Sequence, residues 1–261
     1  LIPAMLAMAT DNWRALRHEF CYLEAVAAVK RPKSLFVDPQ NKGMRTGVQK
    51  MPQPHFNILT RTTQRPRFFE ALCKSLDEQT YREWSHHVIT DDPGSIEYIE
   101  KFGRSAVLTE RRQKRTDLKD HFPYNLYLNE LYKGVQIGYV IVIDDDDFFS
   151  EASSLEFLSI MIEKIGNEPT LFWRVKFPDG YRPRETTNFI FKPGNIASCG
   201  FCFHTKYIEA AIWDEFKESD FRVAHKVKLV SETVYYLKES VVTCLQRAVG
   251  FGGFGQRDDK S

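Results

Sequence analysis

The sequence predicts an α/β fold built on a Rossmann-like, mainly parallel sheet. One indication is the apolar run at 139–143, which leads into four consecutive aspartates, Asp144 to Asp147. Such a run is typical of a strand buried on both faces. The other indication is the regular alternation of short apolar segments with helical patterns from His55 onward, which favours parallel strands joined by crossover helices. Ligands of such sheets bind at the carboxyl ends of the strands, which is where the aspartates are expected.

The first half of this region is expected to contain four strands and two helices. The predicted strands lie at 56–59, 87–90, 106–109 and 140–143. A helix is predicted to begin at Pro66, because proline suits the first helical position, and a second at 123–132. In the second half we expect strands at 171–177, 188–191, 197–203, 233–237 and 241–245, and helices at 207–216 and 220–227.

The composition divides the chain into three segments. Residues 1–53 combine a helical pattern at 13–29 with a Pro- and Gly-rich stretch, and are expected to be a helical extension with a linker. Residues 54–249 form the predicted main domain, and 250–261 a flexible Gly-rich tail. Because the chain begins at Leu1 rather than methionine, we expect further domains of a longer polypeptide.

Charge and cysteine content exclude several classes of protein. The formal net charge of +1 over 261 residues gives no basis for binding nucleic acid. Five cysteines without framework spacing favour a reducing, cytoplasmic compartment. Cys199 and Cys202 lie in a segment expected to be extended, so their thiols would point to opposite faces, which argues against a redox or zinc site. No stretch is long and apolar enough for a transmembrane helix, so contact with a membrane would be peripheral.

The four aspartates need a counter-charge, because carboxylates this close together raise each other's pKa values unless cations neutralise them. A hard divalent ion, Mg²⁺ or Mn²⁺, held by one or two carboxylates together with substrate phosphates fits this requirement. A solvated acidic turn is the alternative.

Four motifs, in the expected order, resemble the inverting glycosyltransferase family 2, whose members have the GT-A fold. They are Ile58-Leu59-Thr60-Arg61-Thr62 followed by Arg65-Pro66, the segment SLDEQTY at 75–81, the pair Asp91-Asp92, and the D-x-D element within Asp144 to Asp147. The resemblance covers about residues 55–247. It implies a nucleotide-binding half and an acceptor-binding half, with a nucleotide-sugar donor and a glycan acceptor as partners.

The same resemblance suggests roles for individual residues. Asp91 would accept the N3–H of uracil or thymine, and Asp145 would contact the ribose. Asp144 and Asp146 form the D-x-D pair, with Asp146 the main ligand of Mn²⁺ or Mg²⁺ and Asp147 behind it. The remaining donor-site positions are Thr60 and Arg61 after the first strand, Arg112 in the basic loop at 110–115, and Asn125 in the following helix.

Asp220 is the expected general base, because it opens a helix where the family places that carboxylate. Ser219 and Arg222 depart from the acidic residues usual in the family motif, and Ser219-Asp220 is also a plausible helix cap. Rival bases are Glu232, Asp214 and Glu218. Trp173, Trp213 and the loop at 177–183 are candidates for an acceptor-binding wall, although core packing is the alternative for both tryptophans.

The expected function is therefore an inverting, metal-dependent transfer of a sugar to a glycan hydroxyl, from a UDP- or dTDP-linked rather than a GDP-linked donor. A sugar-1-phosphate nucleotidyltransferase would need a Gly-rich loop after the first strand, and residues 60–65 contain no glycine. The alternative from another class is a non-catalytic GT-A scaffold that binds a glycan or a partner within a larger protein.

Overall fold

The computed structural model describes residues 53–184 and 191–244, which belong to one compact unit. Residues 1–52 of the predicted extension and linker (1–53), the tail at 250–261 and most of the strand predicted at 188–191 lie outside the described residues. No helix in the described ranges has the length and apolar character needed to cross a lipid bilayer.

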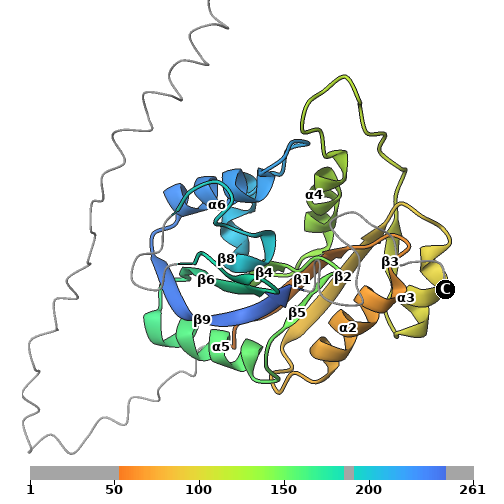
Figure 1. The fold of residues 1–261 in the computed structure, drawn as a ribbon. Helices are drawn as coiled ribbons and strands as arrows, with labels where there is room; N and C mark the ends of the chain where they lie inside the picture. Colours follow the sequence, from red (N-terminus) through yellow and green to blue (C-terminus); the bar gives the residue numbers. More distant parts are fainter. Residues whose placement is uncertain (1–52, 185–190, 245–261) are drawn as a thin grey trace, which may run out of the picture. The chain divides into compact units, whose positions relative to one another are not determined.

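One nine-stranded sheet organises the described residues, in the order β3-β2-β1-β4-β8-β6-β9-β5, with β7 paired to β6 (Figure 1). The strands β1 to β4 pair with one another in parallel, whereas β8 is antiparallel to both β4 and β6. The bounds are Phe56–Arg61 (β1), Trp84–Thr90 (β2), Ala106–Leu108 (β3), Tyr139–Val142 (β4), Asp147–Phe149 (β5), Thr170–Phe177 (β6), Gly180–Arg182 (β7), Phe201–His204 (β8) and Val234–Cys244 (β9).

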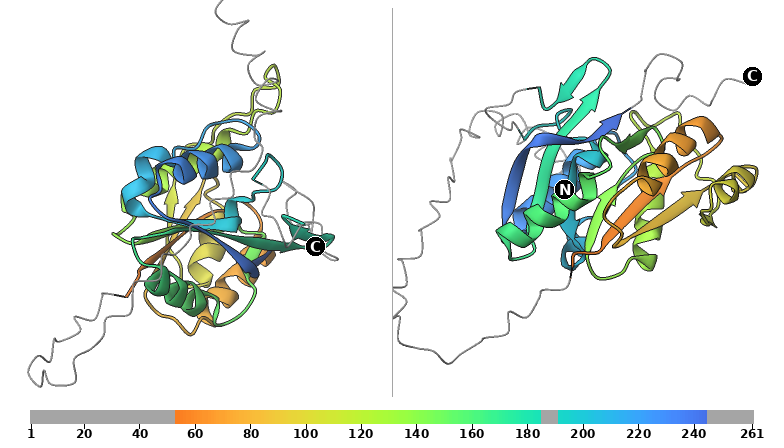
Figure 2. Two further views of the ribbon diagram at one scale, coloured as in Figure 1. Left: turned by 90° about the vertical axis from the view of Figure 1, so that its left-hand side faces the viewer. Right: turned by 90° about the horizontal axis from the view of Figure 1, so that it is seen from below.

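Helices cover both faces of the sheet, as the left view of Figure 2 shows. Helices α2 (Pro66–Asp77), α3 (Ser95–Lys101) and α5 (Ser154–Ile165) lie on one face. Helices α4 (Tyr127–Leu131) and α6 (Ser219–Val230) lie on the other. Each face has its own apolar core: Leu72 and Leu158 pack with Trp173 on the first, and Leu128 and Val223 with Phe172 on the second. This two-sided burial explains why the strands are apolar on both faces.

The topology brings the functional candidates to one edge of the sheet. Strands β1, β2 and β4 are parallel, and β6 runs in the same direction as β4 because two antiparallel pairings separate them. The carboxyl ends of β1, β2, β4 and β6 therefore share an edge. Arg61, Asp91 and Asp144 lie at the ends of the first three, as expected for ligand binding in this class of sheet.

Several predicted elements differ from the observed ones. Strand β1 extends to Arg61, so Thr60 lies inside a strand and not in the loop after it. The segment at 197–203 begins with a 3-10 turn, Ser198–Gly200, before β8. Cys199 and Cys202 consequently belong to the same apolar core and do not point to opposite faces. The helix predicted at 207–216 is a 3-10 helix, Thr205–Ala210, and the last two predicted strands are continuous in β9.

Candidate active site

The largest group of predicted site residues lines a cavity of about 420 Å³ at the carboxyl edge, here called the first cavity. Its walls come from the loop after β1, the end of β2, the basic loop at 110–115, the start of the α4 region and the aspartates after β4. The lining residues are Arg61, Thr62, Thr63, Arg65, Asp91, Arg111, Arg112, Gln113, Lys114, Pro123, Tyr124, Tyr127, Asp144, Asp145 and Asp146.

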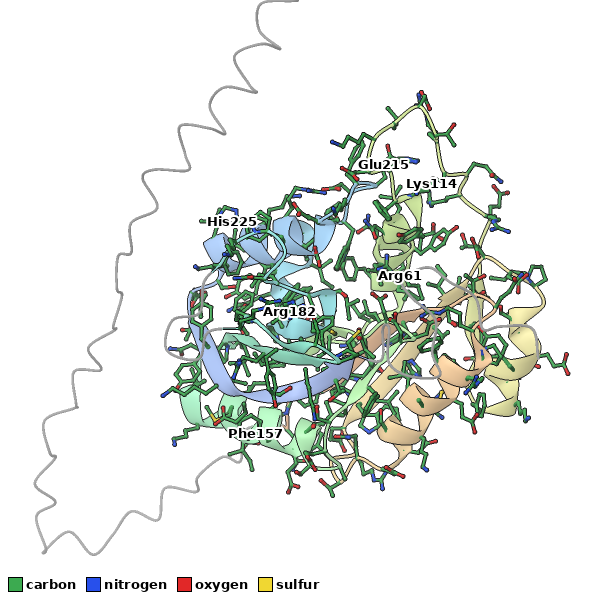
Figure 3. The ribbon with its side chains drawn as sticks, viewed as in Figure 1. Arg61, Lys114, Phe157, Arg182, Glu215 and His225 are labelled. Atoms are coloured by element: carbon green, nitrogen blue, oxygen red, sulfur yellow. The ribbon has the colours of Figure 1, made fainter. Side chains whose placement is uncertain are left out.

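Arg61 connects three of the predicted positions, and Figure 3 shows it between the sheet and α4. Its Nε and Nη2 donate to the two carboxylate oxygens of Asp144 at 2.8 and 3.0 Å, and its Nη1 donates to Asn125 Oδ1 at 2.7 Å. Burial alone would raise the pKa of Asp144, but Arg61 and the Ser198 hydroxyl more than offset this and hold it below its ordinary value. Asp144 is therefore an ionised partner of a fixed guanidinium.

Asp145 and Asp146 share a second guanidinium, that of Arg65. Its Nη1 contacts Asp145, its Nη2 donates to Asp146 Oδ2 at 3.0 Å, and Thr62 Oγ1 donates to Asp145 Oδ2 at 2.8 Å. Burial raises the pKa values of both carboxyls, and repulsion among the aspartates adds to this, while Arg65 opposes it. The sequence did not single out Arg65 or Thr62 for a role of their own. The signal was available, because both lie in the loop between β1 and the proline that opens α2.

A divalent ion fits the donor set behind Arg65. Carboxylate oxygens of Asp146 and Asp147 and the Cys244 sulfur lie within 4.8 Å of one another, and all three residues are buried. Asp147 Oδ1 is buried without a hydrogen-bond partner in the structure, and an unsatisfied buried oxygen is costly unless something binds it. Asp146, a predicted metal ligand, belongs to this cluster. Asp144, the other predicted metal ligand, lies outside this cluster and is held by Arg61.

The opposite wall of the first cavity contains Asp91 and two tyrosines. Tyr127 donates its hydroxyl hydrogen to Asp91 Oδ2 at 2.9 Å, and Arg111 Nε lies 3.9 Å from the same oxygen. Among the described residues, Asp91 Oδ1 accepts no hydrogen bond. Arg112 lines the cavity but is also engaged, because its Nη2 donates to Glu130 Oε1 at 2.8 Å.

Thr60 is the one predicted donor-site residue that the structure does not bring to a cavity. It is fully buried; its hydroxyl donates to the Ile143 carbonyl at 2.8 Å and lies 3.0 Å from His86 Nε2. Thr60 ties β1 to the end of β4, and the next threonine on the same side, Thr62, reaches the aspartates instead. The extra length of β1 explains the difference.

The basic loop is fastened to the segment that precedes α6. The backbone N–H of Phe122 donates to the Glu215 carbonyl at 2.6 Å, and that of Lys217 to the Asp120 carbonyl at 2.8 Å. His121, which is 2% exposed, accepts from the Arg115 backbone N–H at its Nδ1 and lies 3.3 Å from Glu215 through its Nε2. Lys114 and Glu215 therefore lie on adjacent segments (Figure 3).

A second cavity of about 420 Å³ adjoins the first, and the two share Arg61, Tyr124 and Asp144. It is also lined by Phe122, Asn125, Gly194, Ser198, Trp213, Lys217, Glu218, Ser219 and Asp220. Asp220 lies in the first turn of α6 and accepts from the Phe221 backbone N–H at 2.8 Å. Burial raises the pKa of Asp220 to about 6, although that hydrogen bond and Arg61 oppose the shift. A carboxylate with this pKa is suited to accept a proton near neutral pH.

The rival bases are placed differently. Asp214 forms a two-point ion pair with Arg222, whose Nε donates to Asp214 Oδ2 at 2.6 Å. Arg222, which departs from the family motif, therefore serves to hold the segment before α6. Glu232 lies outside both cavities and faces Lys206 at 3.5 Å. Glu218 lines the second cavity beside Asp220. Trp173 is buried in the core, whereas Trp213, also buried, contributes to the second cavity.

Comparison with known proteins identifies the fold. No protein-family model matches the chain, and no curated protein matches its sequence. S. aureus TarS 1-349 in complex with UDP-GlcNAc matches with a TM-score of 0.60 over 79% of this chain and 61% of that one, at 15% identity. The mannosyltransferase PcManGT from Pyrobaculum calidifontis, in complex with GDP-Man and Mn²⁺, matches with a TM-score of 0.54 over 76% and 59%, at 13% identity. The described chain thus has the fold of these glycosyltransferase structures and spans less than two thirds of each.

Proposed function

We propose that this protein is an inverting, metal-dependent glycosyltransferase that moves a sugar from a UDP- or dTDP-linked donor to a hydroxyl of a glycan. The observation that carries the proposal is the meeting of the two cavities at Arg61 and Asp144, with Asp220 on the far side. A donor in the first cavity and an acceptor in the second would meet at this junction, with a proton acceptor on the acceptor side.

The geometry around Asp91 supports a pyrimidine donor. Tyr127 occupies one carboxylate oxygen of Asp91, which leaves Oδ1 for a single N–H donor from the base. Uracil and thymine present one such donor, N3–H, on that edge. Guanine presents two adjacent donors, N1–H and the 2-amino group, and would need both oxygens. TarS was crystallised with UDP-GlcNAc and PcManGT with GDP-Man, so the fold accommodates either base and the choice depends on such contacts.

Asp146 and Asp147 are the residues that would hold Mn²⁺ or Mg²⁺, beside the Cys244 sulfur. A bound divalent ion supplies Lewis-acid stabilisation of the departing diphosphate. Arg61 and the basic loop at 110–115 contribute positive charge to the same cavity, and guanidinium groups pair well with phosphate oxygens.

The proposed chemical step is a single displacement. The acceptor oxygen forms a bond to the anomeric carbon of the donor sugar while its proton passes to a carboxylate oxygen of Asp220. The bond between the anomeric carbon and the phosphate oxygen breaks, and its electron pair leaves with the nucleoside diphosphate. Attack from the face opposite the leaving group inverts the anomeric configuration.

The donor site is tested by calorimetric titration of UDP, dTDP and GDP, each with Mn²⁺ and with EDTA. We expect metal-dependent binding of UDP or dTDP, lost in Asp146→Asn and retained in Asp77→Asn, which alters an exposed carboxylate on α2. If none of the three nucleotides binds, with or without metal, the enzyme proposal is contradicted and the non-catalytic scaffold is favoured. Once a donor is identified, proton NMR of the product distinguishes inversion from retention, and retention would exclude Asp220 as the base.

A further inference from the structure

The hairpin formed by β6 and β7 projects beyond the rest of the sheet (Figure 2). It leaves the sheet at the carboxyl end of β6, on the edge where Asp144 follows β4. Only β8 separates β6 from β4, and adjacent strands lie about 4.8 Å apart, so the two strands lie roughly 10 Å from each other, and the hairpin begins a few residues further along β6. A polymer that enters the second cavity could therefore reach the hairpin with its next one or two sugar units.

The hairpin is strongly basic in a chain that is nearly neutral. Residues 174–184 contain Arg174, Lys176, Arg182 and Arg184 but a single acidic residue, Asp179, a difference of +3 (4 − 1) against +1 for the whole chain. Arg182 pairs with Asp179 at 2.6 Å. Within 53–184 and 191–244, the other three basic side chains form no ion pair with a carboxylate. No carboxylate of the described residues neutralises their charge.

The strand register places two of these cations and an aromatic ring on one face. Lys176 is opposite Tyr181, and opposed residues of an antiparallel pair share a face. Arg174 lies two residues before Lys176 on β6, so their side chains are on the same face of the sheet. The Arg174 guanidinium stacks over the Tyr181 ring at 4.3 Å. It also donates to the carbonyls of Pro183 and Arg184 at 3.1 and 2.9 Å, which fixes its position.

This face lies on the acceptor side of the sheet. Phe172, which alternates with Arg174 along β6, packs in the core beneath α6. The face formed by Arg174, Lys176 and Tyr181 is therefore on the same side of the sheet as Asp220. Tyr181 and Lys176 are exposed, and Arg174 is half-buried.

We propose that this hairpin face binds an acidic glycan, so that the acceptor carries a carboxylate or phosphate on each repeating unit. The proposal rests on the function proposed above and specifies the class of acceptor. An exposed tyrosine ring packs against the apolar face of a sugar, and the flanking Arg174 and Lys176 pair with anionic groups. A single aromatic residue and a near-neutral chain are a poor match for single-stranded nucleic acid, which uses several stacking rings and a continuous basic groove.

The experiment compares binding of four probes of similar length: hexagalacturonate, a glycerol-phosphate hexamer, neutral maltohexaose and a thymidine hexanucleotide. Fluorescence anisotropy is measured on the full chain, on Arg174→Gln/Lys176→Gln and on a control with equal charge loss, Lys101→Gln/Lys133→Gln, whose exposed lysines lie at the end of α3 and in the 3-10 helix Tyr132–Gly134. We expect at least one acidic glycan to bind at least 10-fold more weakly to the hairpin variant than to the control, with affinity falling as salt rises.

The two acidic probes distinguish a uronic-acid acceptor from a phosphate-linked one. Equal affinity of both variants for the acidic probes, tighter binding of maltohexaose or of the oligonucleotide, or no binding of any probe would overturn the proposal. Titration of UDP with Mn²⁺ into the hairpin variant is the independent readout. UDP binding that is retained while glycan binding is lost supports both proposals. If the wild type binds neither UDP nor dTDP but does bind the acidic glycan, the donor-site proposal is contradicted and glycan binding by the hairpin is not.

Discussion

At the scale of single residues, Asp220 is the group on which the proposed chemistry depends most. It is half-buried in the second cavity, has a raised pKa and lines that cavity together with the Arg61–Asp144 pair. Asp220→Asn keeps the shape but cannot accept a proton, so we expect the turnover rate to fall about 10²- to 10⁴-fold, the usual contribution of general acid–base catalysis. UDP affinity, measured by calorimetry, should not change. Glu218→Gln, in the same cavity, should remain within a few-fold of wild type, and a larger loss there than in Asp220→Asn would make Glu218 the base.

The pKa of Asp220 also predicts a pH profile. The base must be ionised to act, so activity should rise with pH while Asp220 titrates and level off above its pKa of about 6. The logarithm of kcat/KM should therefore have a slope near one below pH 6 and become flat at neutral pH. An initial-rate series from pH 4.5 to 8.5 measures this. If the residual activity of Asp220→Asn shows the same acidic limb, another group controls it.

Arg65 is expected to matter for stability as well as for the site. It is the shared partner of Asp145 and Asp146, and the three side chains are at most 11% exposed. Removing one partner of a buried ion pair typically costs about 3 to 5 kcal/mol, so Arg65→Gln should lower the free energy of unfolding by about that amount at pH 7.

Urea unfolding at two pH values tests the cause of this loss. Burial already raises the pKa values of both carboxyls in the fold, and loss of Arg65 raises them further. Wild type and variant then differ only above the wild-type folded-state pKa values, where Arg65 lets the carboxyls ionise in wild type while those of the variant stay protonated. The deficit of Arg65→Gln should therefore shrink at pH 5, and Arg65→Lys should restore part of the stability. A deficit that does not change with pH would indicate lost packing against Phe68, on which Arg65 stacks.

At the scale of elements, the basic loop is shaped by its attachment to the segment before α6. His121 contacts both, so His121→Ala should free the loop at 110–115 without altering the sheet. We expect faster tryptic cleavage at its Arg and Lys residues and a several-fold weaker affinity for UDP. Cleavage sites are identified by mass spectrometry, and Lys133→Gln serves as the control. Unchanged cleavage with weaker UDP binding would instead indicate that His121 acts on the donor directly.

The elements that sequence reasoning predicted correctly share a strong local signal. Helix α2 begins at Pro66, and β4 lies directly before the aspartates, as predicted. A proline at the first helical position and an apolar run can both be recognised from the local sequence, without knowledge of tertiary contacts. The errors arise where pairing decides the structure. Strand β9 is continuous because β6 and β5 pair along it, although its polar residues Lys238, Glu239 and Ser240, the first two exposed, resemble a turn. Helix α5, which is required between β5 and β6, was not anticipated at all.

In the candidate site too, local sequence signals predicted the positions of residues, whereas contacts between distant residues could not be predicted. Asp91, Asp145, Asp146 and Asp220 lie in the two cavities because they directly follow strands or open a helix, positions that can be inferred from the chain. The partners that fix them cannot be inferred, because the contacts of Arg61 with Asp144 and of Thr62 with Asp145 join residues 83 positions apart. Thr60 was wrongly expected in the loop after β1, because the end of β1 at Arg61 is determined by its pairing with β2 and not by the local sequence.

At the scale of the whole molecule, the two halves of the sheet contribute different parts of the site. The parallel half supplies Arg61, Asp91 and the aspartates that line the first cavity, while α6 and the segment at 194–198, beyond β4, supply the second. Arg61 and Asp144 belong to both cavities. A ligand that fixes this pair therefore restrains both halves together, so donor binding should stabilise the entire described fold and not only the loops around the donor.

Thermal unfolding in the presence of ligand tests this expectation. At a free UDP concentration 100 times its dissociation constant, binding to the folded state alone adds about 2.7 kcal/mol, which for a domain of this size is a rise in Tm on the order of 5 to 10 °C. We expect this rise with Mn²⁺, little of it with EDTA, and little of it in Asp146→Asn, while Asp77→Asn behaves as wild type. Because the sheet joins both cavities, the transition should stay single and shift as a whole. A second transition left at the ligand-free temperature would show that the two halves unfold independently, and an equal shift in EDTA would show that the donor site needs no metal.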